Sequence, residues 1–277
     1  MDNNKIIVSI LMPTYNRAGT IGLAIESVLR QNYELWELLI IDNQSTDNTK
    51  DIVEQYTVKD KRIKYFNVQK SKNPGISDYL NYGIKIAAGE FIARLDDDDE
   101  WCSEDKLSKQ IEFLQSNKDY VLVGGGAVMV DGNRKEMYKF LKRETDSAIR
   151  NNALYANPFW HNTVVFRKQP VLEIGGYNNY RFVEDWDLWL RLGKRGKLYN
   201  IQDHLSLYMN AGQNLSVGNQ RLAARTILGL IKKYRNEYPN YSKAFILNFM
   251  QYLFSLLPLF IRRRVQNFLF YIKRNYF

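Results

Sequence analysis

Along the first 95 residues, short continuous apolar runs alternate with stretches in which apolar residues recur every three or four positions. Continuous apolar runs are typical of strands buried on both faces of a parallel sheet, and the three-to-four spacing is typical of amphipathic helices. The expected strands are residues 6–12, 36–42, 62–68 and 90–95. Three helices are expected: the first begins near Ile21, the second ends near Tyr56 and the third spans 75–89. Ser45 or Asp47 is the expected N-cap of the second helix.

This alternation with short connections predicts an α/β fold in which helices flank an open, mostly parallel central sheet. Ligands bind such sheets at the carboxyl ends of the strands. Three polar loops leave those ends, at residues 13–17, 42–47 and 96–101. We therefore expect the three loops to face one crevice.

Beyond Trp101 the pattern is mixed. Residues 103–117 and 184–196 are expected helices, and the second has acids near its start and bases near its end, as the helix dipole favours. Residues 162–167 are an expected short strand, and 120–130 are an expected strand that contains three consecutive glycines. Because no Lys-Ser/Thr pair follows them, the glycines indicate close packing or a bulge rather than a phosphate loop.

Four consecutive aspartates, residues 96–99, follow the fourth expected strand. Carboxylates at a strand end suit Mn²⁺ or Mg²⁺, which could neutralise a departing diphosphate. The alternative is a solvated acidic loop or a helix cap. Strand alternation places Asp96 and Asp98 on one side and Asp97 on the other.

Charge is unevenly distributed. The chain has 39 Lys and Arg and 30 Asp and Glu, for a net charge of +9. Positions 221–277 hold eleven bases and one acid, Glu237, so positions 1–220 are close to neutral. A neutral body with a basic, aromatic-rich end favours an anionic membrane surface over nucleic acid as partner.

Residues 245–261 are strongly apolar but short for a membrane span, which needs about 20 residues. Asn248, Gln251 and Ser255 interrupt them. We expect helices that lie in the membrane interface; a core-packing or oligomerising helix and a true span are the alternatives. The beginning of the chain lacks a signal-peptide pattern, and a single cysteine, Cys102, excludes an internal disulfide, so a cytoplasmic setting is expected.

Three stretches resemble family 2 glycosyltransferases, which are inverting enzymes of the GT-A fold: "SILMPTYNRAGTIGLAIESVLRQNYELWELLIIDNQSTDNT", "NPGISDYLNYGIKIAAGEFIARLDDDDEW" and "GGYNNYRFVEDWDLWLRLGKRG". The resemblance implies a Rossmann-like GT-A domain over 1–220, with a nucleotide-binding half of about 1–100 and an acceptor half of about 101–220. Residues 221–277 lie outside the resemblance and are the expected basic, amphipathic, helical membrane-association region. The resemblance further implies a UDP-sugar donor and Mn²⁺ or Mg²⁺ as cofactor.

On the donor side, the resemblance assigns Thr14 and Tyr15 to the base, with Tyr15 as the stacking face, and Asp42 to the uracil imide. The family usually has a second Asp after this position, and here it is Asn43. In the D-x-D pattern, Asp96 would lie by the ribose and Asp98 on the metal. Asp97 is the variable middle residue of this donor-binding set.

Two neighbours of that pattern have alternative roles. Asp99 could support the site from behind or cap a following helix. Arg94 could contact the diphosphate or form a salt bridge to the aspartate loop.

On the acceptor side, "VEDWDLW" resembles the family motif that supplies the general base, which would be Asp185 with Glu184 beside it. A carboxylate needs partial burial to act as a base near neutral pH. Helix capping is the alternative for these acids. His161 and Trp186 are candidate acceptor-side residues, and His161 is otherwise a core histidine.

Together these features predict an inverting, metal-dependent glycosyltransferase peripheral on the inner face of the cell membrane. It would move a sugar to a hydroxyl of a glycan or polyprenyl-diphosphate-linked acceptor in surface polysaccharide synthesis. One alternative is a nucleotidyltransferase, although "MPTYNRAGT" offers only Arg17 and Gly19 as a phosphate-gripping loop. Another is a non-catalytic sugar-nucleotide or glycan-binding subunit. An oligomer is possible, and no nucleic-acid partner is expected.

Overall fold

The computed structural model describes residues 6–68, 75–209, 219–258 and 262. Its strands are β1 (Val8–Thr14), β2 (Trp36–Asp42), β3 (Ile63–Asn67), β4 (Phe91–Arg94), β5 (Glu100–Trp101), β6 (Tyr120–Val130), β7 (Glu136–Phe140), β8 (Val165–Arg167) and β9 (Lys197–Met209). Its helices are α1 (Ile21–Leu29), α2 (Thr49–Lys59), α3 (Ile76–Ile86), α4 (Lys106–Ser116), α5 (Asp146–Asn152), α6 (Lys168–Glu173), α7 (Glu184–Leu192), α9 (Gln220–Lys233) and α10 (Tyr241–Leu256), with a 3-10 turn at His161–Thr163.

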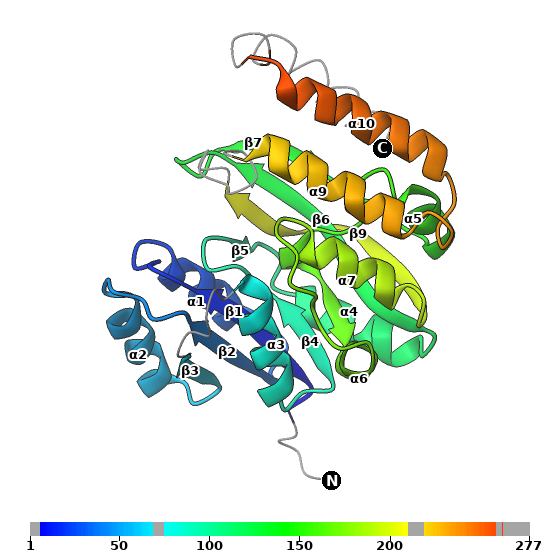
Figure 1. The fold of residues 1–277 in the computed structure, drawn as a ribbon. Coiled ribbons are helices and arrows are strands. Elements are labelled where there is room, and N and C mark those ends of the chain that lie inside the picture. The colour runs from blue at the N-terminus through cyan, green and yellow to red at the C-terminus, as the bar shows by residue number, and fades with distance from the viewer. Residues whose placement is uncertain (1–5, 69–74, 210–218, 259–261, 263–277) are drawn as a thin grey trace.

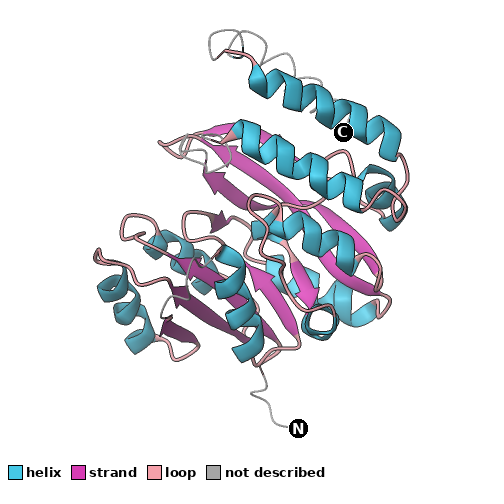
Figure 2. Cartoon of the chain, viewed as in Figure 1, coloured by secondary structure: helices cyan, strands magenta, loops and turns pink. Residues whose placement is uncertain are grey.

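The described strands form one sheet in the order β3-β2-β1-β4-β8-β6-β9-β5, with β7 paired to β6 (Figures 1 and 2). Strands β1 to β4 pair in parallel, as the alternation predicts. In the second half β8 joins antiparallel to β4 and β6, whereas β6 and β9 are parallel. The sheet is therefore parallel over the first hundred residues and mixed beyond, where the pattern of strands and helices is also mixed.

Two apolar layers cover the two faces of the sheet, because successive strand residues point to opposite sides. Ile10 and Met12 pack with residues of α1, α2 and α4 on one face. Leu11 packs with residues of α3, α6 and α7 on the other. Apolar burial on both faces explains why these strands read as continuous apolar runs.

Two local predictions have definite outcomes. The glycine stretch of β6 is confirmed as a place of close packing and irregular register: a Cβ at Gly124 would lie 2.4 Å from Asn200 Oδ1, and the pairing with β9 shifts next to Gly126. The predicted N-cap of the second helix is wrong, since Asn48 holds the N-cap position of α2, without a side-chain cap hydrogen bond. Ser45 instead donates to Asp42, and Asp47 accepts from the backbone N–H and hydroxyl of Thr49.

The last two described helices form an outer layer (Figure 1). Leu230 and Ile231 of α9 are buried against Trp186 and Leu190 of α7, and Ala244 of α10 joins the same cluster. Helix α9 is thus packed into the body, and α10 lies outermost. No helix in the described part of the chain is both long and apolar enough to cross a membrane.

Candidate functional site

The parallel strands β1, β2 and β4 end at a common edge. In the register of the sheet, Thr14 lies beside Asp42 and Leu11 lies beside Arg94. The loops that follow these strands are consequently brought together, as the alternation of strands and helices predicts.

Backbone and side-chain hydrogen bonds join the first two loops. Asn16 has a positive φ of 54°, and its side-chain oxygen accepts from Thr46 N at 2.8 Å. Ser45 Oγ accepts from Asn16 N at 2.9 Å, and Thr49 Oγ1 accepts from Arg17 N at 2.8 Å. The two loops therefore form one polar wall.

Asp42 is fully buried at the base of this wall. One carboxylate oxygen accepts from the Ser45 N–H at 2.9 Å and from its hydroxyl at 2.7 Å, and the other accepts from the Tyr65 hydroxyl at 2.5 Å. A carboxylate has about four acceptor positions, so one position is left.

The two predicted base-contacting residues differ in exposure. Tyr15 is 46% exposed on the loop after β1, a placement that suits a stacking surface. Thr14 is buried, and its hydroxyl has no hydrogen-bond partner among the described residues.

The four aspartates alternate in exposure. Asp96 and Asp98 are partly exposed, with side chains 27% and 41% accessible, whereas Asp97 and Asp99 are buried. The strand itself ends at Arg94, and Asp97 and Asp98 lie in a turn in which Asp99 N donates to Asp96 O at 3.3 Å. The exposure nevertheless separates the pair predicted to contact nucleotide and metal from the other two. Which of them binds a ligand stays a prediction.

Burial and mutual repulsion raise pKa values within the run of aspartates. Burial, followed by the neighbouring carboxylates, raises the pKa of Asp97 to about 7. The pKa of Asp98 is also raised, first by burial and then by Asp96. Arg17 offsets part of this repulsion, with contacts of 3.3 Å to Asp97 and 3.5 Å to Asp98. Added positive charge would stabilise the run further.

Arg94 is completely buried. Its Nη2 lies 2.6 Å from Asp96 Oδ1, and its remaining donors face Leu11 O, Leu95 O and His161 Nε2. Of the two roles considered for Arg94, the salt bridge to the aspartate loop is the one observed. A direct contact between Arg94 and a diphosphate is not supported at this degree of burial.

His161 lies behind Arg94. Its Nε2 is 3.1 Å from Arg94 Nε and 2.9 Å from the Tyr177 hydroxyl. Because Arg94 Nε can only donate, His161 Nε2 accepts and the ring proton sits on Nδ1. Burial and the Arg94 charge lower the pKa of His161 to about 3. His161 is therefore a neutral residue that holds Arg94, rather than one presented to an acceptor.

Asp99 anchors the aspartate loop to two other parts of the chain. One carboxylate oxygen accepts from Asn162 Nδ2 at 2.5 Å and the other from Met209 N at 2.9 Å. Asp99 does not cap α4, whose N-cap is Asp105. Of its two possible roles, support of the aspartate loop is the one observed.

The second acid group stands at the start of α7. Asp185 Oδ2 accepts from Asn157 Nδ2 at 2.7 Å, and Asp185 Oδ1 accepts from the Trp186 N–H. Glu184 Oε2 is buried and has no hydrogen-bond partner among the described residues. An unpaired buried carboxylate oxygen is costly, so its retention is consistent with a ligand hydroxyl or cation at this point.

The pKa values of this acid pair are raised. Burial raises the pKa of Asp185 to about 6 and that of Glu184 to about 7, and Asp185 adds to the shift at Glu184. Asp96 raises both further, so the two acid groups share one electrostatic environment. This is the pKa range that suits a general base near neutral pH.

The Trp186 side chain is buried under α9 and is not presented to an acceptor. It is 4% exposed, its indole N–H donates to Ala153 O at 2.8 Å, and it packs against Leu230 and Ile231 of α9. The acceptor-side prediction for Trp186 is not supported, because α9 covers the ring.

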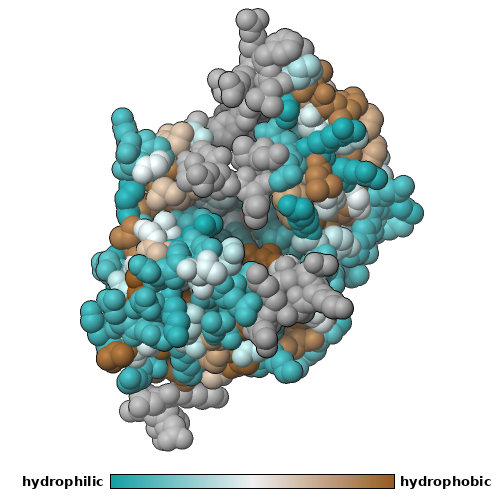
Figure 3. Space-filling model, turned by 60° about the vertical axis from the view of Figure 1, so that its left-hand side comes forward, coloured by the Kyte–Doolittle hydropathy of each residue, from teal (hydrophilic) through white to brown (hydrophobic). Residues whose placement is uncertain are grey.

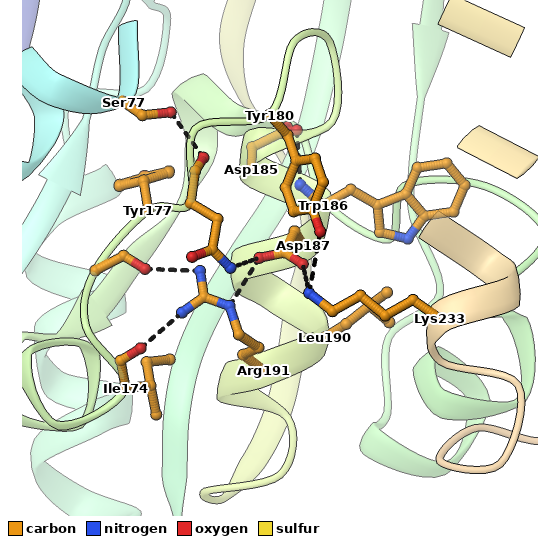
Figure 4. A network of polar contacts seen from close by, with 12 residues as sticks. Ser77, Ile174, Tyr177, Tyr180, Asp185, Trp186, Asp187, Leu190, Arg191 and Lys233 are labelled. Carbon is orange, nitrogen blue, oxygen red and sulfur yellow. Dashed lines mark hydrogen bonds and ion pairs between the residues drawn. The ribbon is translucent and has the colours of Figure 1, made fainter. Parts of the chain in front are cut away.

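The next acid on α7, Asp187, is the centre of a polar network (Figure 4). It is fully buried and accepts from Asn178 Nδ2, Arg191 Nε, Lys233 Nζ and the Tyr234 hydroxyl at 2.7 to 2.8 Å. Burial alone would raise its pKa, but these hydrogen bonds outweigh burial and lower it. The network ties α9 to the helix that carries Asp185.

Within the described residues, no three Asp, Glu, His or Cys side chains converge on a point that could hold a metal ion. The acids do fit a cation shared with a ligand, since Asp96 and Asp98 are both partly exposed and repel one another. Mg²⁺ and Mn²⁺ are commonly held by one or two carboxylates together with substrate phosphates.

Sequence reasoning missed Asn157, Asn162 and Tyr177, which orient Asp185, Asp99 and His161. None lies near its partner in the chain; the separations are 28, 63 and 16 residues. Local patterns carry no signal for such contacts. Only a search for polar residues in otherwise apolar stretches, such as "NPFWHNTVVF", could have marked two of them.

Comparison with known proteins identifies the family of the chain. A family model described as Glycosyl transferase family 2 matches residues 9–174. The UDP-Glc:alpha-D-GlcNAc-diphosphoundecaprenol beta-1,3-glucosyltransferase WfgD of Escherichia coli is 42% identical over 199 residues, which cover 70% of this chain and 73% of that protein. The GalNAc(5)-diNAcBac-PP-undecaprenol beta-1,3-glucosyltransferase of Campylobacter jejuni subsp. jejuni is 30% identical over 227 residues, covering 81% and 72%.

A solved structure shares the fold. The mannosyltransferase PcManGT from Pyrobaculum calidifontis, in complex with GDP-Man and Mn²⁺, superposes with a TM-score of 0.65. It is 19% identical and covers 92% of this chain and 71% of its own.

Proposed function

Because the chain belongs to glycosyl transferase family 2 and has its α/β GT-A fold, we propose that it transfers a sugar from a UDP-sugar, with inversion, to a hydroxyl of a lipid-linked acceptor. The observation that carries this proposal is the acid pair on α7. Asp185 and Glu184 have raised pKa values, and the charge of Asp96 contributes to both shifts. Glu184 Oε2 has no hydrogen-bond partner among the described residues.

The donor would bind on the wall formed by the first two loops. Tyr15 stacks on the base, Thr14 and Asp42 line its edge, and Asp96 hydrogen-bonds the ribose. Arg94 acts through Asp96, since it is buried and its Nη2 lies 2.6 Å from that carboxylate. His161 and Tyr177 in turn hold Arg94 in place.

Asp185 accepts the proton of the acceptor hydroxyl as that oxygen attacks the anomeric carbon. Direct displacement needs no enzyme nucleophile and inverts the configuration, so an α-linked donor yields a β-linked product. Asn157 orients Asp185 by donating to Oδ2, which leaves the carboxylate ionised and its other lone pairs available. Glu184 adds negative charge next to Asp185 and accepts a hydrogen bond from a second hydroxyl of the acceptor.

Asp98, with Asp96 beside it, would hold a divalent cation together with the donor diphosphate. Such a cation, Mn²⁺ or Mg²⁺, supplies neutralising charge for the leaving UDP. Support comes from the repulsion within the aspartate run and from the Mn²⁺ in the PcManGT structure.

The lipid-linked acceptor is proposed from two similar proteins whose names include an undecaprenol-linked acceptor. It accords with a role in surface polysaccharide synthesis at the inner face of the cell membrane. The basic residues after position 220 would favour an anionic lipid surface.

The deciding experiment compares the natural chain with Asp185→Asn, which keeps the size of the side chain. The probes are UDP-glucose, Mn²⁺ and an undecaprenyl-diphosphate-linked GlcNAc acceptor, and both UDP release and glycolipid product are measured. We expect Asp185→Asn to lower kcat by at least about 10³-fold while the KM for UDP-glucose stays within a few-fold. Full activity of this variant would refute the base assignment, and a chain that binds donors but never releases UDP would refute the transferase.

A further inference from the structure

Helix α10 is turned with its polar side inward. Ala244, Asn248 and Ser255 are the buried residues of this helix, and Asn248 Nδ2 donates to Ala244 O, Leu154 O and Tyr155 O. Two of the three polar residues that interrupt the apolar stretch, Asn248 and Ser255, are therefore on the buried side of the helix, and Gln251 is half-buried.

The opposite face of α10 is apolar and exposed. Its large side chains are between 39% and 60% exposed: Ile246, Phe249, Met250, Leu253, Leu256 and, at the C-cap, Leu257. At 100° per residue these six positions form one continuous stripe, here called the outer stripe. Hydrophobic side chains gather along the upper part of the molecule in Figure 3, where Figure 1 places α10.

The charges around the outer stripe have a single sign. Lys243 is exposed on α10, whereas Arg262, after the helix, is half-buried and donates to Gln220 Oε1 at 2.8 Å. In the sequence no Asp or Glu occurs after Glu237, which is itself paired with Lys194 at 2.7 Å. A protein partner would need acids to meet these bases and an apolar patch to meet the stripe. An anionic lipid surface provides both over any area, because its headgroups attract the bases and its acyl chains take up the apolar side chains.

We propose that the outer stripe of α10 is the surface that enters an anionic lipid monolayer, with the helix parallel to the membrane plane. A second copy of the chain is the less favoured occupant. Association through this face would bring the bases of two copies together without acids between them.

Packing and hydrogen bonds connect α10, through α9, to α7, the helix that carries Asp185. Ala244 of α10 packs in one cluster with Leu230 and Ile231 of α9. Helix α9 is tied through Lys233 to Asp187, two residues after Asp185 on α7 (Figure 4). The Tyr234 hydroxyl of α9 donates to the same carboxylate. Insertion of the stripe thus fixes the height of Asp185 above the lipid, where a lipid-linked hydroxyl would arrive; this last step rests on the proposed function, whereas lipid binding does not.

The test uses the full chain with Met250→Gln/Leu253→Gln, and Leu172→Gln as the matched control. Leu172 is 43% exposed, close to the 47% of Leu253, and lies on α6, away from α10 (Figure 1). Flotation is measured with phosphatidylglycerol/phosphatidylethanolamine vesicles and with phosphatidylcholine vesicles. We expect the natural chain and the control to float with the anionic vesicles, and the double variant to partition at least about tenfold less. Equal flotation of all three proteins would overturn the proposal.

A second measurement reports insertion directly. Trp fluorescence from Leu253→Trp should be quenched by vesicles with brominated acyl chains, and that from Leu172→Trp should not. Light scattering decides the alternative: a natural dimer that the double variant converts to monomer would assign the stripe to a second copy. With a water-soluble acceptor, the double variant should keep natural activity and lose transfer only to acceptor in vesicles. A natural chain that floats with the anionic vesicles but transfers sugar to neither acceptor would count against the proposed function and leave the lipid-binding proposal standing.

Discussion

Asn157 Nδ2 donates a 2.7 Å hydrogen bond to Asp185 Oδ2 across 28 residues of sequence. The bond favours the ionised carboxylate and so opposes the burial that raises the pKa of Asp185. The balance of these two effects sets the pH range in which Asp185 can act as a base.

The natural enzyme should lose activity as the pH falls through the range of about 6 to 7. The pKa values of Asp185 and Glu184 are raised to about 6 and about 7, and below them the base is protonated. The check is kcat/KM for UDP-sugar between pH 5 and 9. The acidic limb should disappear in the residual activity of Asp185→Asn, and a limb that persists there would belong to another group.

Replacing Asn157 with Ala should move that acidic limb to higher pH. Without its hydrogen bond the ionised form of Asp185 is less favoured, and the expected shift is about one pH unit. Asn152→Ala is the matched control, because Asn152 donates to Ala148 O and not to Asp185. A limb that does not move would mean that Asp185 is not the titrating base.

Arg94→Met should destabilise the fold strongly. It removes the partner of Asp96 from a fully buried position, and we expect the free energy of unfolding to fall by about 3 kcal/mol in urea. Arg94→Met/Asp96→Asn should recover part of that loss, because no unpaired carboxylate is left. UDP binding should stay weak in both variants. A double variant as unstable as the single one would show that the ion pair is not the cause.

Asp187→Asn should detach α9 from α7. Asp187 is fully buried with four donors, so we expect a loss of about 2–4 kcal/mol at pH 7 and faster hydrogen exchange in residues 220–233. Since the folded-state pKa is lowered, the contribution is present above the unfolded value of about 4 and is lost as the pH falls toward the folded value. The difference between natural chain and variant should therefore shrink in acid. Asp203→Asn, at an exposed ion pair with Lys109, should cost under about 1 kcal/mol.

Chelation should abolish transfer, and Mn²⁺ should raise the melting temperature measured with UDP present. Asp98→Asn should remove most of that Mn²⁺-dependent rise, since Asp98 is on the open side of the run. Asp203→Asn again serves as control. An Mn²⁺ response unchanged in Asp98→Asn would exclude Asp98 as the metal-binding residue.

The strands of the first half could be predicted closely because burial on both faces leaves a continuous apolar run, as in β2. Strand alternation also predicts two exposed and two buried aspartates, but the structure produces this division in a turn, after β4 has ended at Arg94. The N-cap of α2 could not be predicted, because Ser45, Asp47 and Asn48 are all residue types that favour this position. Contacts of Ser45 with Asn16 and Asp42, in a distant loop and strand end, draw Ser45 away from the helix.

By itself the sequence determined which residues occupy the strand ends, the order of the motifs and the basic character of positions 221–277. These properties depend on periodicity and composition, which neighbouring residues carry. The tertiary structure decided that Arg94 serves Asp96, that His161 stands behind Arg94, that Trp186 is covered by α9, and that α10 turns Asn248 inward and Leu253 outward. Each of these depends on which surface of a segment meets a partner from a distant part of the chain, and packing settles that only when the whole core has formed.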